Sequence, residues 1–219
     1  MKLISAVREQ LDADEHKSRE LWLVCQVLND ALKSNPADAI EAVPRNVLKE
    51  IKSIVQKVNE SEPNSLSQLA LKSVPKQALE SGVYTEDALI SRFEKVNTVA
   101  RRVSLIGDEG GSLWRYLLSY LQAALVIERS DRKPTSNELE DKTFDATALD
   151  TFDILSRMRY HLKQRNLEMS LRYANQLRGE PRKVANDWIK DVRTHLETRQ
   201  ATNILLAQAA SVSVRTLKN

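Results

Sequence analysis

Glycine and proline are scarce in this chain, and their scarcity limits the folds that it can adopt. Only 5 glycines and 6 prolines occur among its 219 residues. Because these two residues are the main breakers of helices, long uninterrupted helices are expected. Apolar residues recur at helical spacing in each segment, and no segment alternates with the period of a strand. The sequence therefore predicts an all-α fold: a coiled-coil-like N-terminal helix followed by antiparallel helical hairpins, arranged as a bundle or a short solenoid.

The segment Lys2–Lys33 has the pattern of the end of a coiled coil. Its apolar residues follow a three–four spacing, which the polar Asp14 and Ser18 interrupt. We expect this helix to pair with a second copy of the chain. Cys25 is the only cysteine, so no internal disulfide is possible, and its heptad core position predicts a buried, inert thiol. The predicted self-association residues are Ile4, Val7, Leu11, Leu21, Cys25, Leu28 and Leu32.

The segment Pro44–Val58 predicts an amphipathic helix with two possible roles. One face is apolar and the other is mostly basic, as in helices that lie on an anionic membrane surface. The alternative is that the apolar face packs inside the protein, and the absence of Trp and Phe favours this alternative. The candidate membrane-binding residues are Arg45, Val47, Leu48, Lys49, Ile51, Lys52, Ile54, Val55 and Lys57.

Breakers and caps predict the remaining helices. Pro and Gly residues separate the segments, and Thr85 and Asp145 are predicted to cap the helices that follow them. The segment Leu113–Val126 is apolar nearly all round, which is typical of a central core helix. From its pairing with the preceding helix we predict that Phe93, Val96, Leu117 and Leu121 are core residues. The expected helices are Ser65–Lys72, Pro75–Glu80, the long segment after Thr85, Leu113–Val126, 145–164, Leu167–Arg178 and the segment from Pro181 to about Ser211.

The charges and histidines give no sign of an active site. His16, His161 and His195 lie far apart and lack the spacing of metal ligands, so no catalytic residue, metal or cofactor is expected. Residues 151–200 carry a net charge of +5, which leaves a nucleic-acid-binding or generic adaptor module as an alternative. Interleaved acidic residues and the lack of interleaved aromatic residues argue against nucleic acid. The longest apolar stretch, Leu113–Val126, is shorter than the roughly 20 residues that cross a bilayer, and no targeting peptide is expected.

The turn before the last helix is the predicted surface for a protein partner. Trp188 lies on an apolar stripe with Val184 and Val192, so a core position is its default interpretation. Tryptophan and arginine are also the residues enriched at binding hot spots. The candidate partner-binding residues are Leu177, Arg178, Arg182, Lys183 and Trp188.

Several motifs in a fixed order resemble the mitofilin family. The similarity extends over nearly the whole chain, is strongest from Gly82 onward and is weak from Pro36 to Asn64. Glu20-Leu21-Trp22-Leu23 and Ala31-Leu32-Lys33 resemble the family's segment before its C-terminal domain. The motifs of that domain are Gly82-Val83-Tyr84-Thr85-Glu86-Asp87-Ala88-Leu89, Arg92-Phe93, Ala100-Arg101-Arg102-Val103, Leu118-Ser119-Tyr120-Leu121-Gln122, Asn175-Gln176-Leu177-Arg178-Gly179-Glu180 and Asp187-Trp188.

The resemblance implies a non-enzymatic scaffold of the mitochondrial contact site and cristae organising system. Members of the family are anchored in the inner membrane and face the intermembrane space. For this chain the resemblance implies self-association, contact with anionic lipid such as cardiolipin at crista junctions, and binding of a small CHCH-domain subunit. It also predicts a division into residues 1–34 as the end of the coiled coil, 35–81 as an amphipathic linker, and 82–219 as the mitofilin domain.

Overall fold

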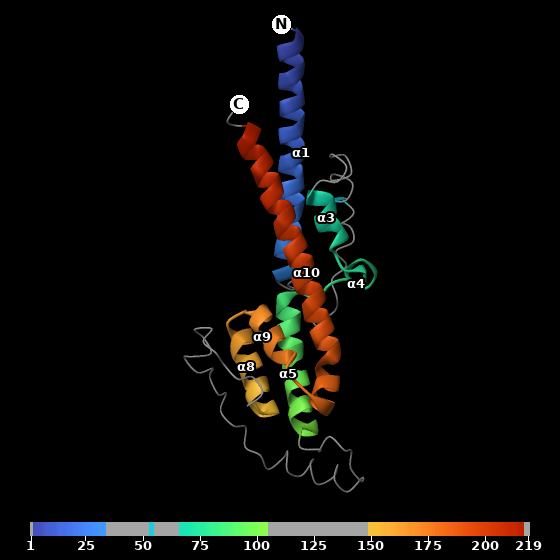
Figure 1. Ribbon diagram of the computed structural model, residues 1–219, viewed down its shortest axis with the longest axis vertical. Coiled ribbons are helices and arrows are strands. Elements are labelled where there is room, and N and C mark those ends of the chain that lie inside the picture. The colour runs from blue at the N-terminus through green and yellow to red at the C-terminus, as the bar shows by residue number, and fades with distance from the viewer. Residues whose placement is uncertain (1, 34–52, 55–65, 105–148, 217–219) are drawn as a thin grey trace. The chain divides into compact units, whose positions relative to one another are not determined.

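A computed structural model describes residues 2–33, 53–54, 66–104 and 149–216 (Figure 1). Apart from one isolated bridge residue, Val83, the regular secondary structure of these residues is helical, which confirms the predicted all-α class. The segment Leu113–Val126, with the predicted core residues Leu117 and Leu121, lies outside the described residues. The helices are α1 (Lys2–Lys33), α3 (Leu66–Lys72), α4 (Lys76–Glu80), α5 (Glu86–Val103), α8 (Thr151–Lys163), α9 (Leu167–Ala174) and α10 (Gly179–Thr216).

Side chains with capping chemistry define the start of two helices. The Oδ1 atom of Asp150 accepts a hydrogen bond from the backbone N–H of Asp153 at 2.6 Å, so α8 begins directly after Asp150. The Oδ1 atom of Asn166 accepts from the N–H of Met169 at 3.0 Å at the start of α9. Both bonds satisfy an N–H that has no partner inside the helix. The prediction that Asp145 caps this helix was wrong, because Asp150 has the same chemistry and its position is set by packing that the sequence does not show.

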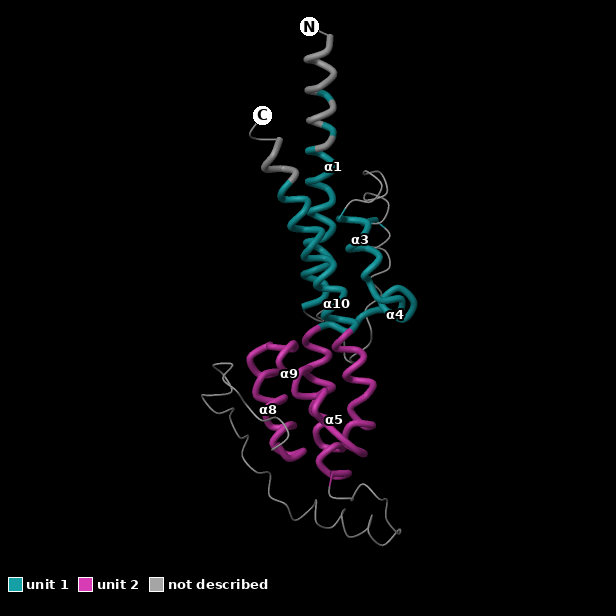
Figure 2. Tube along the Cα trace, in the orientation of Figure 1, with its two compact units in different colours: residues 1–85, 194–219 teal, residues 86–193 magenta. Residues whose placement is uncertain are grey.

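Unit 1 consists of residues 1–85 and 194–219 (Figure 2). Its apolar core brings the C-terminal half of α1 together with α3, α4 and the C-terminal half of α10. Burial of these side chains is the main stabilising contribution, at about 25 cal/mol per Å² of apolar surface. The buried residues of this core are Leu21, Cys25, Leu28, Leu32, Ile54, Ala70, Ala78, Val83, Leu205 and Ala209.

Unit 2 consists of residues 86–193 and contains α5, α8, α9 and the first part of α10. The rings of Phe93 on α5 and Trp188 on α10 pack at a centroid distance of 5.3 Å and a tilt of 53°. Tilted aromatic pairs of this kind contribute beyond the area they bury. Phe93 is fully buried, which confirms its predicted core position, whereas Val96 is half-buried.

The predicted division at residues 34 and 81 separates consecutive segments of the chain, whereas each of the two units is a set of residues that contact one another. Unit 1 joins the beginning and the end of the chain, so each unit combines segments that are distant in sequence. The division into 1–34, 35–81 and 82–219 therefore stays a prediction.

Candidate interaction surfaces

Helix α1 carries the predicted self-association stripe, and the fold uses part of that stripe internally. Leu21, Cys25, Leu28 and Leu32 are at most 8% exposed and belong to the core of unit 1. The side chains of Ile4, Val7 and Leu11 lie outside the described residues. Pairing through the whole stripe stays a prediction, and the structure shows that its C-terminal half already contacts residues of the same chain.

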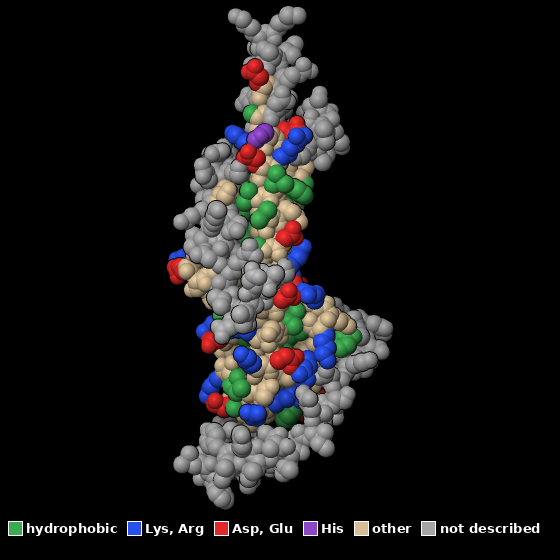
Figure 3. Space-filling view, turned by 180° about the vertical axis from the view of Figure 1, so that it is seen from behind, with side chains coloured by type: hydrophobic (Ala, Val, Ile, Leu, Met, Phe, Trp, Pro, Cys, Tyr) green, Lys and Arg blue, Asp and Glu red, His purple; other side chains and the backbone are tan. Residues whose placement is uncertain are grey.

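A different face of α1 leaves large apolar side chains exposed. Trp22, Leu23 and Val27 are 42%, 56% and 56% exposed, and we call these three residues the α1 ridge. Figure 3 shows hydrophobic side chains gathered on this side of unit 1. Leu66 and Leu69 on α3 are exposed to a similar degree. The α1 ridge by itself groups three large apolar side chains on one helix, and such a cluster, unlike a single exposed leucine, is typical of an interaction site.

Pairs of polar side chains border the α1 ridge at both ends. Before it, Glu15 pairs with Arg19, and Glu20 lies 3.4 Å from the Nδ1 atom of His16. After it, the Nζ atom of Lys33 lies 3.3 Å from Asp30. All three pairs join residues three or four positions apart, so they lie along the helix surface and satisfy each other locally. The ridge is therefore an apolar centre between two charged borders.

The turn between α9 and α10 is fixed by Arg182. Its Nη1 atom donates to the backbone carbonyl of Ala174 at 2.7 Å and to the Oδ1 atom of Asn175 at 3.3 Å. A guanidinium at the C-terminal end of a helix satisfies a carbonyl that has no partner in the helix and interacts favourably with the helix dipole. Gly179, with φ of 57°, takes the left-handed conformation that a glycine adopts without strain.

The other predicted partner-binding residues divide into exposed and buried members. Arg178 and Lys183 are exposed, and Lys183 pairs with Glu180 at 2.5 Å. Leu177 and Trp188 are buried, at 3% and 1% exposure. Only the basic members can therefore meet a partner directly, and their role as a binding surface stays a prediction.

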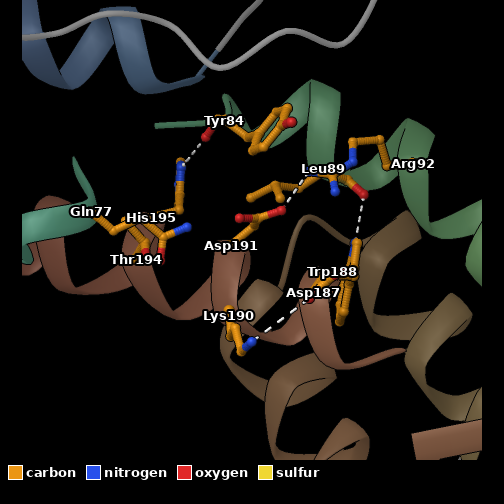
Figure 4. A network of polar contacts seen from close by, with 10 residues as sticks. All are labelled: Gln77, Tyr84, Leu89, Arg92, Asp187, Trp188, Lys190, Asp191, Thr194 and His195. Carbon is orange, nitrogen blue, oxygen red and sulfur yellow. Dashed lines mark hydrogen bonds and ion pairs between the residues drawn. The ribbon is translucent and has the colours of Figure 1, made fainter. Parts of the chain in front are cut away.

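Trp188 contacts α5 through polar as well as apolar atoms. Its Nε1 atom donates to the backbone carbonyl of Leu89 at 2.9 Å (Figure 4). One turn further along α10, Asp191 accepts from the Nη1 atom of Arg92 at 2.7 Å, and both side chains are partly buried. The indole is thus fully satisfied inside unit 2, which matches the default core interpretation of the sequence.

His195 is a buried histidine on α10 within unit 1. Its Nδ1 atom lies 2.9 Å from the backbone carbonyl of Tyr84, and since a carbonyl can only accept, Nδ1 carries the proton (Figure 4). Nε2 is buried without a hydrogen-bond partner among the described residues. Burial lowers the pKa of His195 from 6.5 to about 4; the Tyr84 contact opposes this shift and the charge of Arg199 adds to it. The imidazole is therefore neutral at physiological pH.

Ile54 is the one member of the membrane-binding candidate that the structure describes. It is 1% exposed and belongs to the core of unit 1. The other eight members lie outside the described residues, so membrane contact stays a prediction. None of the helices in the described part of the chain has the length and apolarity that a membrane crossing requires.

In the described part of the chain, the remaining cysteine and histidine side chains are placed as follows. Burial raises the pKa of the Cys25 thiol to about 12, so the nucleophilic thiolate is suppressed. His161 is buried and stacks on Tyr173 at 5.4 Å, whereas His16 is exposed on α1. Within the described ranges, no three residues among the His, Cys, Asp and Glu side chains are arranged to hold a metal ion.

Acidic neighbours offset much of the basic charge between residues 151 and 200. The pairs are Arg157–Asp153, Arg159–Glu94, Arg165–Glu86, Arg165–Asp87, Arg172–Glu168, Lys183–Glu180 and Lys190–Asp187. A cation that is paired within the protein contributes less to the release of counterions from a nucleic-acid backbone. The pairing therefore weakens the nucleic-acid alternative.

Arg165 contacts the first turn of α5, a role that was not predicted from the sequence. Its backbone has φ of 57°, a left-handed conformation that is unusual for a residue with a Cβ atom. The guanidinium contacts Asp87 at 2.9 Å and Glu86 at 3.3 Å, and hydrogen bonding to Asp87 is the largest reason that the pKa of Arg165 is raised. The acidic first turn of α5 was visible in the sequence, but nothing local identified a partner almost eighty residues away.

Comparisons with known proteins identify relatives over nearly the whole chain. The family described as "Mitofilin: Mitochondrial inner membrane protein" matches residues 1–210. The MICOS complex subunit Mic60 of Drosophila melanogaster is 40% identical over 210 residues, which cover 94% of this chain and 28% of the relative. MICOS complex subunit MIC60-2 of Caenorhabditis elegans is 28% identical, covering 94% of this chain and 31% of the relative. MICOS complex subunit mic60 of Neurospora crassa is 26% identical, covering 98% of this chain and 28% of the relative.

The chain spans less than a third of the length of these curated relatives, at 28%, 31% and 28%. No solved structure matches it. The similarity therefore concerns one part of a larger type of protein.

Proposed function

Because the chain belongs to the mitofilin family of mitochondrial inner membrane proteins, we propose that it is the interaction region of a MICOS complex subunit. In this proposal it is a non-enzymatic scaffold on the intermembrane-space side of the inner membrane. It helps to form and maintain crista junctions by associating with a second copy, by contacting the membrane, and by binding a CHCH-domain subunit. The family match and the names of the relatives support this proposal.

The observation that carries the self-association part is the α1 ridge. The opposite face of α1 is buried in the core of unit 1, so the ridge is the face of α1 that is still available. Tryptophan is enriched at interfaces, where an apolar centre with a polar border is the usual arrangement. A ridge on one helix can meet the same ridge of a second copy around a two-fold axis, so that one patch supplies both sides of the contact.

Sedimentation velocity over a range of concentrations tests this part. We expect the wild-type chain to form a reversible dimer, and Leu23→Ser combined with Val27→Ser to be monomeric. Both side chains are 56% exposed, so the substitution should leave helicity and thermal stability nearly unchanged. Leu66→Ser combined with Leu69→Ser, at exposed positions on α3, is the matched control and should still dimerise. Self-association through the ridge is refuted if the wild type stays monomeric or if both variants behave alike.

The basic turn before α10 is the proposed surface for the CHCH-domain subunit. Arg178 and Lys183 are exposed there, and Arg182 holds the turn in place through its bond to Ala174. Rim charges of this kind act mainly on the association rate and its salt dependence. Arg178→Glu combined with Lys183→Glu should slow association with a purified CHCH-domain subunit, as measured by surface plasmon resonance. Lys190→Glu, at an exposed position on the same helix, is the control, and equal effects of the two changes would contradict the assignment.

The segment Pro44–Val58 is the proposed membrane contact. Lys49 and Lys52 lie on the basic face predicted from the sequence, and each basic residue near an anionic surface contributes about 1 kcal/mol at low salt. Reversal of both charges should reduce co-sedimentation with cardiolipin-containing liposomes and leave helicity unchanged. Ile51→Asp should also reduce binding, and circular dichroism then tells whether that change unfolds the protein. If the charge reversal leaves liposome binding intact, this segment is not the contact.

A further inference from the structure

The exposed face of α1 carries opposite charges at its two ends, and this arrangement selects a direction for pairing. The side chains of Arg19 and Asp30 are 69% and 60% exposed, on either side of the α1 ridge. They lie eleven positions apart, which is close to three helical turns, so both project from the same line of the helix surface. We propose that two copies of α1 pair in antiparallel orientation, with Arg19 of each copy opposite Asp30 of the other. This inference rests on self-association through the α1 ridge, as proposed above.

The apolar residues of the ridge have nearly the same centre as the two charges. Leu23 and Val27 are each 56% exposed and lie between Arg19 and Asp30 in sequence. The midpoint of the apolar pair is position 25, and the midpoint of the charged pair lies between positions 24 and 25. A two-fold axis perpendicular to the helices at this level therefore places Leu23 of one copy beside Val27 of the other. The same axis places each guanidinium beside a carboxylate.

Parallel pairing of the same face is disfavoured by the same charges. In a symmetric parallel dimer each residue lies opposite its own copy, so Arg19 would face Arg19 and Asp30 would face Asp30. Like charges at such positions repel each other, whereas the antiparallel register replaces both repulsions with attractions. Both side chains are exposed, so the core of unit 1 neutralises neither of them. The charge pattern therefore favours one of the two directions in which the ridge can pair.

Both charges also have a partner within α1, which affects the strength of the contact but not its direction. Arg19 pairs with Glu15, and the Nζ atom of Lys33 lies 3.3 Å from Asp30. Exposed pairs three or four positions apart on a helix are weak, and a carboxylate has room for a second cation. His16 and Lys33 also lie opposite each other in this register, and each has an acidic neighbour on its own helix. The trans pairs therefore form in addition to the pairs along the helix.

The register also determines how far the two helices overlap. Helix α1 ends at Lys33, and the position opposite Lys33 in the second copy is His16. The overlap from His16 to Lys33 is about 27 Å long at 1.5 Å per residue. The residues Ile4, Val7 and Leu11 of the predicted self-association stripe lie before this overlap. Antiparallel pairing through the ridge therefore does not require them.

Disulfide cross-linking tests the direction of pairing. The variants Arg19→Cys and Asp30→Cys are purified separately, mixed and oxidised mildly, and the products are identified by intact mass. Antiparallel pairing predicts a disulfide between the two different variants, and one ion pair stays intact in that mixed dimer. Identical positions are then separated by about 16 Å along the helix axis, which is beyond the reach of a disulfide. The wild-type chain is the control, because its single cysteine, Cys25, is buried.

Exchange of the two charges tests the ion pairs themselves. Arg19→Asp and Asp30→Arg should each raise the dissociation constant of the dimer about tenfold at low salt in sedimentation velocity, because each turns two attractions into repulsions. The double variant Arg19→Asp with Asp30→Arg should return to nearly the wild-type value, because both pairs form again with reversed signs. Lys17→Asp is the matched control, since Lys17 is exposed on another side of α1 and its reversal should leave the constant unchanged. Circular dichroism checks that each variant keeps its helicity.

The outcomes separate this inference from self-association as such. Disulfides only between identical variants, or no mixed disulfide in a chain that dimerises, would overturn the antiparallel register and leave pairing through the ridge in place. A double variant that stays as weak as either single variant would also overturn it. A wild-type chain that stays monomeric at all concentrations would refute both the register and the proposed self-association.

Discussion

Acidification should destabilise unit 1 through one identified group, His195. Its side chain is 1% exposed, and burial is the main reason that the pKa falls from 6.5 to about 4. The unfolded chain therefore binds a proton more readily than the folded chain between these two values. The stabilisation is complete above the unfolded pKa of 6.5 and is lost as pH falls toward the folded value.

The magnitude follows from the shift in pKa. A difference of 2 to 3 units corresponds to about 3 kcal/mol once both states are protonated, and to about 2 kcal/mol near pH 5. Stability of a domain is usually only about 5–15 kcal/mol, so a loss of this size is readily measured. The physical cause is that protonation places a second N–H, on Nε2, in a position where no described residue accepts it.

Urea denaturation followed by circular dichroism at a series of pH values is the appropriate assay. We expect His195→Gln to keep a donor for the carbonyl of Tyr84 and to lose most of the slope between about pH 5 and pH 7. His161 and the carboxylates remain in both proteins, so their contributions cancel in the difference. Parallel curves for wild type and His195→Gln would refute the reasoning.

Three further outcomes follow from single contacts. Cys25 should resist alkylation in the native protein at about pH 8 and react fully in urea, because burial raises the pKa of its thiol to about 12. Mass spectrometry measures the labelling, and rapid labelling of the native protein would show that unit 1 opens at this residue. Trp188→Phe should lower the free energy of unfolding by about 1–3 kcal/mol in chemical denaturation, since the carbonyl of Leu89 loses the indole N–H as a donor. An unchanged free energy of unfolding would mean that this carbonyl finds another partner. The Arg165→Gly variant should melt at a higher temperature than Arg165→Ala. Both variants lose the contacts to α5, but only glycine adopts a φ of 57° without strain. Equal melting temperatures would show that the backbone is not strained there.

Helix boundaries were predictable where residues restrict the backbone locally. Pro75 precedes α4 and Gly82 follows it with φ of 85°, as their chemistry predicted. Asp150 was missed because an equivalent aspartate lies five residues earlier, and the choice between them depends on tertiary packing. The local sequence thus predicts that a helix begins near these aspartates, and tertiary contacts decide which aspartate caps it.

Long-range contacts were not predictable in the same way. The spacing of the α1 stripe indicated a buried face but did not identify what buries it, and residues of α10 such as Leu205 do so from the other end of the chain. His195 gave no sequence signal, because a lone histidine on a helix is equally compatible with exposure. The tautomer of its neutral ring is set by the carbonyl of Tyr84, which is more than a hundred residues away.

The two faces of α1 can be perturbed separately, and this decides how self-association should be tested. Deletion of residues 1–34 removes the α1 ridge, but it also uncovers Leu205 and its neighbours in the core of unit 1. A change in mass after such a deletion would therefore not identify the interface. Leu28→Ala should cost about 2–5 kcal/mol of stability and leave the dimer intact, because it opens a cavity on the inner face. Leu23→Ser should leave stability nearly unchanged and weaken the dimer. If the two substitutions changed stability and mass together, the inner and outer faces of α1 would not be independent, and the ridge could not be assigned as the contact.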